Sequence, residues 1–119
     1  MADSPTARSL RECRDRGWLA EVVERWIPQS RRRHDLFGCI DLVVLDGSPG
    51  VLGIQATSGA NVAARVTKIR QMVDELGMPH IWLARGNRIE VWGWRKLAKP
   101  VPGTRRRWDL RVVEVHLDG

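Results

Sequence analysis

Apolar positions along the chain follow helical spacing in some segments and strand-like spacing in others, which predicts the order helix, three strands, helix, three strands. The first helix is expected over residues 4–17, with Ser4 as its cap and Gly17 at its end. The second is expected over residues 59–77, because its apolar residues recur at intervals of three and four. Those residues are Val62, Val66, Ile69, Val73 and Leu76.

Strands are predicted in the remaining apolar segments, which turn-forming residues separate. The sequence DGSPG at residues 46–50 is a strong turn signal and joins two of these strands into a hairpin. Both hairpin strands are apolar almost throughout, which is typical of strands covered on both faces. A second hairpin is expected around the turn at Gly86-Asn87. The predicted strands cover residues 18–27, 34–45, 51–58, 79–84, 89–97 and 108–117.

The length of 119 residues and this order of elements predict one α/β or α+β domain over residues 1–119, with a mixed central sheet flanked by helices. Cys13 and Cys39 are too few for a disulfide framework or a zinc site, so both are expected to be buried in a reducing compartment. No apolar segment has the length of a membrane span, and the N-terminus has no signal-peptide core. These features indicate a cytoplasmic protein.

The charge of the chain is strongly basic and comes mainly from arginine. The formal net charge is +6, and 17 of the 20 basic residues are Arg. Arginine suits bidentate contacts to phosphate, so the composition favours a polyanionic partner, with nucleic acid as the leading candidate. An arginine bias from a GC-rich genome is the alternative explanation of the excess.

Three polar residues interrupt the first predicted hairpin at positions that should be buried. Asp41 lies on the first strand, and Gln55 and Thr57 lie on the second. Because successive side chains of a strand point to opposite faces, Gln55 and Thr57 share a face, and Asp41 can lie beside them. Burying such a cluster costs free energy unless it is satisfied, and a metal ion or a phosphate would satisfy it.

The series Asp41, turn, Gln55-Ala56-Thr57, then a helix carrying Lys68, resembles the active-site hairpin of the PD-(D/E)XK nuclease superfamily. Within that superfamily the chain is most similar to small Holliday-junction-resolvase-like and phage-encoded members, over roughly residues 5–95. The resemblance implies an α-β-β-β-α-β core of restriction-endonuclease type with extra C-terminal strands. It also implies Mg²⁺- or Mn²⁺-dependent hydrolysis of DNA in the cytoplasm of a bacterial or phage-infected cell.

The chain departs from the superfamily pattern at two positions. Gln55 replaces an acid and Thr57 replaces a lysine, which implies that the Gln55 amide oxygen binds the metal and that Lys68, or else Arg65, supplies the cation. Asp41 would provide the carboxylate, and Ala56 its backbone carbonyl. The second carboxylate is assigned in order of preference to Glu24, Asp35 and Glu12. The predicted catalytic set is therefore Asp41, Gln55, Lys68, Glu24 and Thr57.

Short arginine runs flanked by tryptophan or histidine are the predicted contacts to double-stranded or branched DNA, and the resemblance implies a homodimer. Two alternatives stay open. One is a decayed nuclease fold that binds DNA or a protein without cleaving, and the other is a protein-binding module that uses the Trp-rich C-terminal strands. The predicted nucleic-acid contacts are Arg31, Arg32, Arg33, Arg65, Arg105, Arg106 and Arg107.

Overall fold

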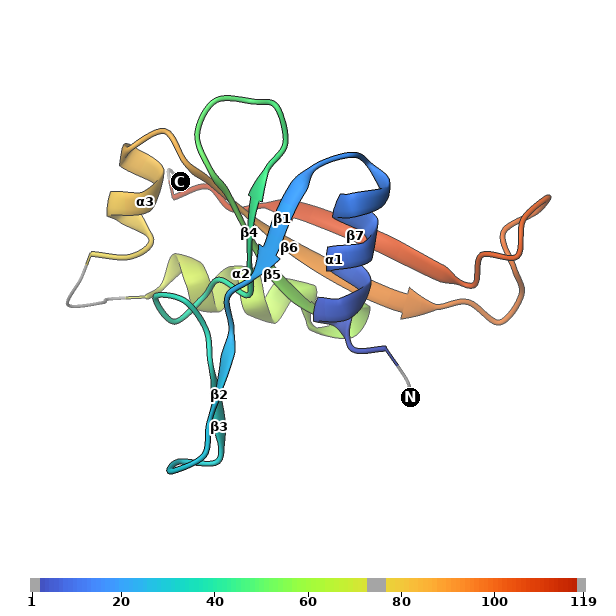
Figure 1. The fold of residues 1–119 in the computed structure, drawn as a ribbon, viewed down its shortest axis with the longest axis horizontal. Helices are drawn as coiled ribbons and strands as arrows, with labels where there is room; N and C mark the ends of the chain where they lie inside the picture. The colour runs from blue at the N-terminus through green and yellow to red at the C-terminus, as the bar shows by residue number, and fades with distance from the viewer. Residues whose placement is uncertain (1–2, 73–76, 118–119) are drawn as a thin grey trace.

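A computed structural model describes residues 3–72 and 77–117 and shows a mixed five-stranded sheet flanked by helices, which confirms the predicted α+β class (Figure 1). The sheet order is β1-β4-β5-β6-β7; β5 and β6 are parallel and the other neighbours antiparallel. A separate β2–β3 hairpin projects away from the sheet. The helices are α1 (Pro5–Asp15), η1 (Gly59–Asn61), α2 (Val62–Arg70) and α3 (His80–Ala84). The strands are β1 (Leu19–Val22), β2 (Arg25–Ile27), β3 (Arg32–His34), β4 (Leu42–Leu45), β5 (Leu52–Ser58), β6 (Arg88–Lys96) and β7 (Trp108–Glu114).

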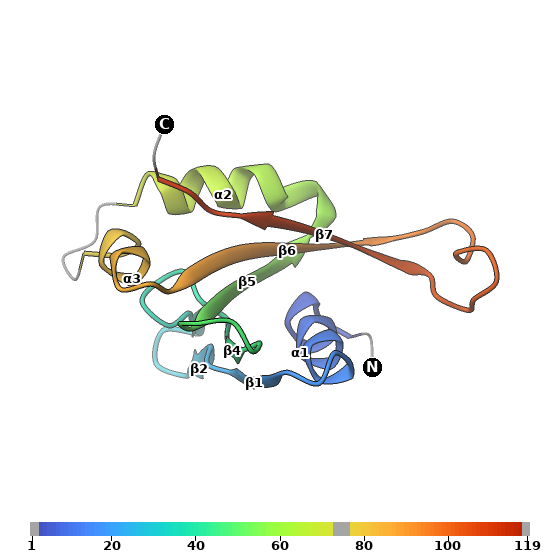
Figure 2. The ribbon, with the colours of Figure 1, turned by 90° about the horizontal axis from the view of Figure 1, so that it is seen from above.

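The two faces of the sheet carry separate apolar clusters because side chains alternate along each strand. Helix α1 covers one face, and α2 and α3 cover the other (Figure 2). The α1-side cluster is Cys13, Ala20, Leu42, Val44, Leu52, Ile54, Trp92 and Trp94. The α2-side cluster is Cys39, Ile40, Val62, Ile69, Met78, Ile89, Val91 and Val115. Both cysteines are buried, as predicted.

The first helix forms where its capping residues predict. The Ala7 N–H donates to Ser4 Oγ at 3.1 Å, and Gly17 adopts a φ of 80° beyond the helix end. On the core side, Trp94 Nε1 donates to Ser9 Oγ at 2.9 Å, and both side chains are buried. This bond fixes α1 against β6, 85 residues later in the chain.

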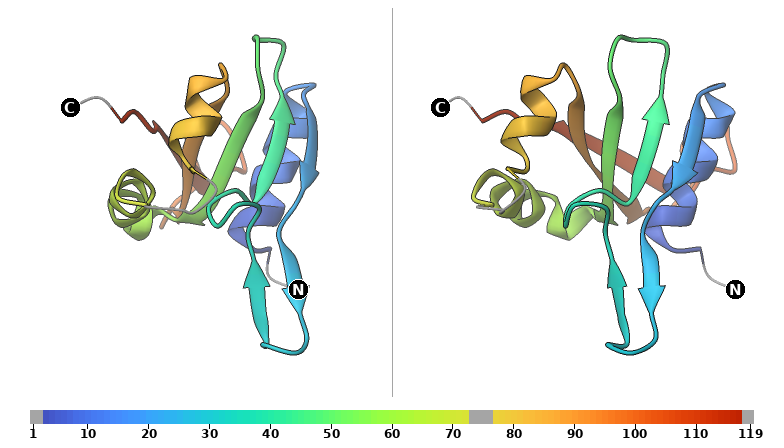
Figure 3. Two further views of the ribbon diagram at one scale, coloured as in Figure 1. Left: turned by 90° about the vertical axis from the view of Figure 1, so that its left-hand side faces the viewer. Right: turned by 60° about the vertical axis from the view of Figure 1, so that its left-hand side comes forward.

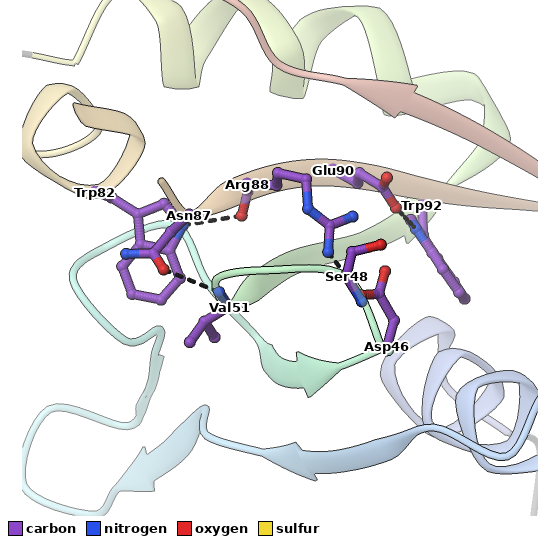
Figure 4. A network of polar contacts seen from close by, with 8 residues as sticks. All are labelled: Asp46, Ser48, Val51, Trp82, Asn87, Arg88, Glu90 and Trp92. Atoms are coloured by element: carbon purple, nitrogen blue, oxygen red, sulfur yellow. Dashed lines mark hydrogen bonds and ion pairs between the residues drawn. The ribbon is translucent and has the colours of Figure 1, made fainter. Parts of the chain in front are cut away.

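The predicted turn at residues 46–50 is present and is held against the start of β6 (Figure 4). Arg88 Nη2 lies 2.7 Å from Asp46 Oδ1, and the Val51 N–H donates to Asn87 Oδ1 at 2.9 Å. The Arg88 hydrogen bond lowers the pKa of Asp46 below its ordinary value. These contacts fix the β4–β5 hairpin to the rest of the sheet.

The strand predicted over residues 18–27 is two strands in different sheets. The N–H groups of Val23 and Glu24 both donate to the Asp41 carbonyl, at 2.8 and 3.3 Å. Two amides on one acceptor resemble a β-bulge, which bends the strand. Strand β1 therefore pairs with β4, whereas β2 turns away and pairs with β3, in a region predicted in part as loop.

The strand predicted over residues 34–45 is also shorter than expected, since β4 begins at Leu42. A tight loop precedes it, in which the Leu36 N–H donates to the Ile40 carbonyl at 2.8 Å. Phe37 and Gly38 both have positive φ, 53° and 79°. The glycine inside the apolar run thus marks a turn, because it tolerates a φ that other residues avoid.

The prediction of a strand over residues 79–84 is wrong, because this segment forms helix α3. Strand β6 is already paired with β5 on one side and β7 on the other, so neither side of β6 is open to residues 79–84, and the hairpin predicted around Gly86-Asn87 does not form. A short apolar run fits either structure, and here tertiary packing decides. Trp82 of α3 instead packs over the sheet beside Gly53 and Ile40.

The second helix is shorter than its apolar pattern predicts. A 3-10 turn, η1, precedes α2, which ends at Arg70 with Gln71 as its C-cap. The rest of the predicted helix includes residues 73–76, which lie outside the described residues. Val62 and Ile69 of the predicted apolar stripe are buried against the sheet.

Candidate metal centre

Three carboxylates from separate segments meet at one point of the α2 side of the sheet. Glu24 lies at the kink between β1 and β2, Asp35 follows β3, and Asp41 immediately precedes β4. One oxygen of each lies within 4.8 Å of an oxygen of the other two. Carboxylate oxygens at such spacing are ligands suited to a hard divalent cation.

Gln55 of β5 joins this cluster through its amide. Its side chain is 3% exposed, and Nε2 donates to Asp35 Oδ2 at 3.2 Å. Its Oε1 is buried and has no hydrogen-bond partner among the described residues. The next residue contributes too, since the Ala56 N–H donates to Asp41 Oδ2 at 2.8 Å. The structure therefore brings the Asp41 and Gln55 segments together, as strand alternation predicted.

The electrostatics of the cluster disfavour three ionised carboxylates. Burial is the largest cause that raises the pKa of Asp41, to about 8, followed by its hydrogen bond with Asp35. The Ala56 N–H acts in the opposite direction, and the negative charges of Asp35 and Glu24 raise the pKa further. A bound cation would reverse this balance, because it stabilises the ionised form of every ligand.

Glu24 also connects the cluster to the projecting β2–β3 hairpin. Arg33 Nη1 lies 2.9 Å from Glu24 Oε1, with the Glu24 side chain 10% exposed and that of Arg33 66% exposed. Arg31 and Arg32 are exposed at the turn and on β3 of the same hairpin. Of the first arginine run, therefore, Arg33 contacts the acidic cluster, whereas Arg31 and Arg32 lie toward the end of the projecting hairpin.

Lys68 and Arg65 lie on one flank of α2, since residues three apart are neighbours on a helix surface. Met72 lies beyond the C-cap of α2, and its Cε lies 3.4 Å from the position of a Cβ built on Gly38. Gly38 belongs to the loop between Asp35 and Asp41. The loop between Asp35 and Asp41 therefore packs against the segment that follows α2, and on α2 itself Lys68 is exposed and Arg65 is partly buried.

The other predicted residues fall in three places. Thr57 is buried on the same face of β5 as Gln55. Glu12, the third choice for a second carboxylate, lies on α1 across the sheet and pairs with Arg16 at 2.8 Å. Glu24 and Asp35, which the sequence offers as alternatives for the second carboxylate, both lie beside Asp41. The second arginine run, residues 105–107, lies in the β6–β7 connection on the α1 side.

Comparisons with known proteins give no indication of function, so the functional argument depends on the geometry of the acidic cluster. No family model, curated protein or solved structure matches the chain. Across residues 3–72 and 77–117, every helix is too short or too polar to cross a membrane.

Proposed function

We propose that this protein is a metal-dependent DNA endonuclease whose cation is held by Glu24, Asp35, Asp41 and Gln55. The observation that carries the proposal is the buried amide of Gln55, which bonds Asp35 and has an unpartnered Oε1 beside three converging carboxylates. An amide oxygen and carboxylates together form a donor set suited to Mg²⁺ or Mn²⁺. The donor set of the chain therefore fits the ion that the sequence resemblance implies.

The residues around the cluster have complementary roles in phosphodiester hydrolysis. When bound, a divalent cation supplies a nucleophilic water at neutral pH and offsets charge on the phosphate oxygens. Asp41 and Asp35 would hold the cation, and Lys68 or Arg65 of α2 would stabilise negative charge that develops on the phosphate. The Ala56 N–H orients Asp41. A role for the Ala56 carbonyl as a further ligand remains a prediction.

Two wider features of the chain support the same function. When the β2–β3 hairpin, η1 and α3 are left out, the order α1, β1, β4, β5, α2, β6 is similar to the α-β-β-β-α-β order that the resemblance implies. The β2–β3 hairpin carries three arginines, of which Arg33 pairs with Glu24 of the cluster, and the net charge of +6 favours a polyanion.

The test is cleavage of labelled linear and four-way-junction DNA with Mg²⁺ or Mn²⁺. Asp41→Asn keeps an acceptor for the Ala56 N–H but removes the charge, so it should abolish cleavage while the protein stays folded. Asp109→Asn is the matched control, because Asp109 is exposed and pairs only loosely with Arg95, at 3.5 Å. Absence of cleavage by the wild-type protein with both metals would refute the proposal.

A second candidate is a nuclease-like fold that binds DNA without cutting it. It is favoured by the neutral side chains of Gln55 and Thr57 at positions where the superfamily pattern has charged residues. It predicts salt-sensitive DNA binding that neither Mg²⁺ nor Asp41→Asn alters. Endonuclease activity in the assay above would exclude it.

A further inference from the structure

The β2–β3 hairpin, here called the arm (residues 25–34), projects away from the main sheet (Figures 1 and 3). Its two strands pair with each other and with no other strand of the described residues. Every side chain of the two strands is exposed except that of Ile27, which is partly buried. Two strands of this length are at best marginally stable in water by themselves. A partner that covers the arm would therefore stabilise it.

The base of the arm is part of the acidic cluster. Glu24 directly precedes β2 and Asp35 directly follows β3. Arg33 of β3 reaches back to Glu24 at 2.9 Å, and Trp26 of β2 is the cross-strand partner of Arg33. Side chains of directly paired residues lie on the same face of a two-stranded sheet. Trp26 therefore lies on the face of the arm that carries Glu24, two residues further from the cluster.

Trp26 is the one exposed tryptophan of the six in the chain, all of which the structure describes. It is 56% exposed, whereas the other five are buried or partly buried. None of the aromatic or cation–π contacts between described residues involves its ring. The flat apolar face of this indole is therefore free to stack on a ligand.

The residues around Trp26 are basic. Residues 25–34 include four arginines and no acid. Arg33 pairs with Glu24, whereas Arg25, Arg31 and Arg32 form no ion pair with any described residue. One exposed apolar residue is common on a protein surface, but one that lies among free guanidiniums on an uncovered arm has a specific chemistry. The arm matches a partner that combines negative charge with flat rings.

A single strand of nucleic acid has both of these properties. Arginine binds its phosphates, and an aromatic side chain stacks on its bases whatever their identity. In a duplex the neighbouring base pairs already cover both faces of each base, and separating them costs free energy. An acidic protein would supply the negative charge but no regular series of flat rings. The indole and the guanidiniums together therefore favour a single strand over both alternatives.

We propose that the arm binds a single-stranded segment of DNA, with Trp26 stacked on a base and the arginines of the arm on the flanking phosphates. The inference rests on the proposed function and names its substrate class, which is DNA that is single-stranded where it meets the acidic cluster. Trp26 is a positioning residue in this arrangement, because it holds the strand beside the cluster and does not touch the reacting phosphate.

The test measures DNA binding in EDTA, so that metal-dependent cleavage does not interfere. Fluorescence anisotropy compares a labelled single strand of about 20 nucleotides with the duplex that it forms with its complement. The wild-type protein should bind the single strand about fivefold or more tightly than the duplex. Trp26→Ala should weaken single-strand binding about tenfold, because it removes the stacking ring, and should change duplex binding less than about twofold.

Two further variants separate stacking from a general apolar effect. Trp26→Phe keeps an aromatic ring and should retain most of the single-strand affinity, whereas Trp26→Leu keeps apolar bulk without a ring and should lose as much as Trp26→Ala. Leu19→Ala is the control, because it removes an exposed apolar side chain of β1 outside the arm and should change neither affinity. If thermal melting shows that Trp26→Ala is unfolded, the comparison of Trp26→Phe with Trp26→Leu decides.

Three results would overturn the inference: no preference of the wild-type protein for the single strand, equal weakening of both DNAs by Trp26→Ala, or full single-strand affinity in Trp26→Leu. The proposed function fails on a different result, which is absence of cleavage with Mg²⁺ and Mn²⁺, and that result leaves the binding data intact. Cleavage together with single-strand binding that does not depend on Trp26 would refute the inference alone.

Discussion

The amide of Gln55 donates to the carboxylate of Asp35 across 3.2 Å, although 20 residues separate them in the chain. The bond leaves Gln55 Oε1 buried without a partner among the described residues. Half a turn of the amide would exchange its donor and acceptor atoms, so that Oε1 faces the carboxylates. A cation between them would make that orientation favourable, as would a proton on one of the carboxyl groups, because two acceptors otherwise repel.

Metal binding should therefore stabilise the fold. We expect Mn²⁺ or Mg²⁺ at 100 times its dissociation constant to raise the free energy of unfolding by about 2.7 kcal/mol. Asp41→Asn should lose most of this response, whereas Asp109→Asn should keep it. Thermal melts with and without metal measure the effect, and an equal response in all three proteins would contradict a site at Asp41.

The metal-free protein should become less stable as pH rises. The folded pKa of Asp41 is about 8 and its ordinary value is 3.8, so the folded state binds the proton more tightly than the unfolded state. The stabilisation that comes from the protonated Asp41 carboxyl is complete below about pH 4 and is lost as pH rises toward about 8.

Asp41→Asn should remove this pH dependence and should make the metal-free protein more stable at pH 7, by up to roughly 4 kcal/mol. Urea unfolding in EDTA between pH 4 and 9 compares the two proteins. The difference in unfolding free energy should grow with pH and level off near pH 8; a constant difference would show that Asp41 does not titrate in this range.

Gln55→Glu should bind metal more tightly and fold less stably without it. A fourth carboxylate adds a charged ligand, which raises cation affinity, by about tenfold in calorimetric titration with Mn²⁺. The same charge adds repulsion when no cation is bound, so the metal-free melting temperature should fall. Gln71→Glu, at the exposed C-cap of α2, is the control and should change neither quantity appreciably.

Lys68→Ala should lower cleavage without weakening metal binding. Its ammonium group is proposed to stabilise charge on the phosphate, and loss of one such donor typically reduces the rate about 100-fold or more. Manganese affinity should stay unchanged, because an ammonium group does not bind a cation. Lys99→Ala, exposed in the β6–β7 connection, should retain full activity; a similar loss in both variants would remove Lys68 from the mechanism.

The contact between Arg88 and Asp46 should stabilise the fold at neutral pH. The lowered pKa of Asp46 means that its contribution is present above its ordinary pKa and is lost as pH falls through the folded value. Asp46→Asn should cost about 1–2 kcal/mol at pH 7 and much less at pH 2–3. Arg95→Ala breaks the exposed pair with Asp109 and should cost less than about 0.5 kcal/mol.

The amino-acid sequence by itself determined the elements whose signals are local. Helix α1 follows from its cap and its terminal glycine, and β5 follows from an apolar run after a strong turn. Asp41 and Gln55 meet because strand alternation and one hairpin turn suffice to place them on one face. These features depend on backbone geometry over a few residues, which the order of residues specifies.

Only the tertiary structure decided the conformation of residues 80–84, the bend after β1 and the position of Glu24. Residues 80–84 became a helix because β6 had no open edge, and the strand after α1 bent because Val23 and Glu24 share the carbonyl of Asp41. That bend places Glu24 beside Asp35 and Asp41. Periodicity cannot reveal such an arrangement, because it depends on which distant backbone groups remain available for hydrogen bonds once the sheet has formed.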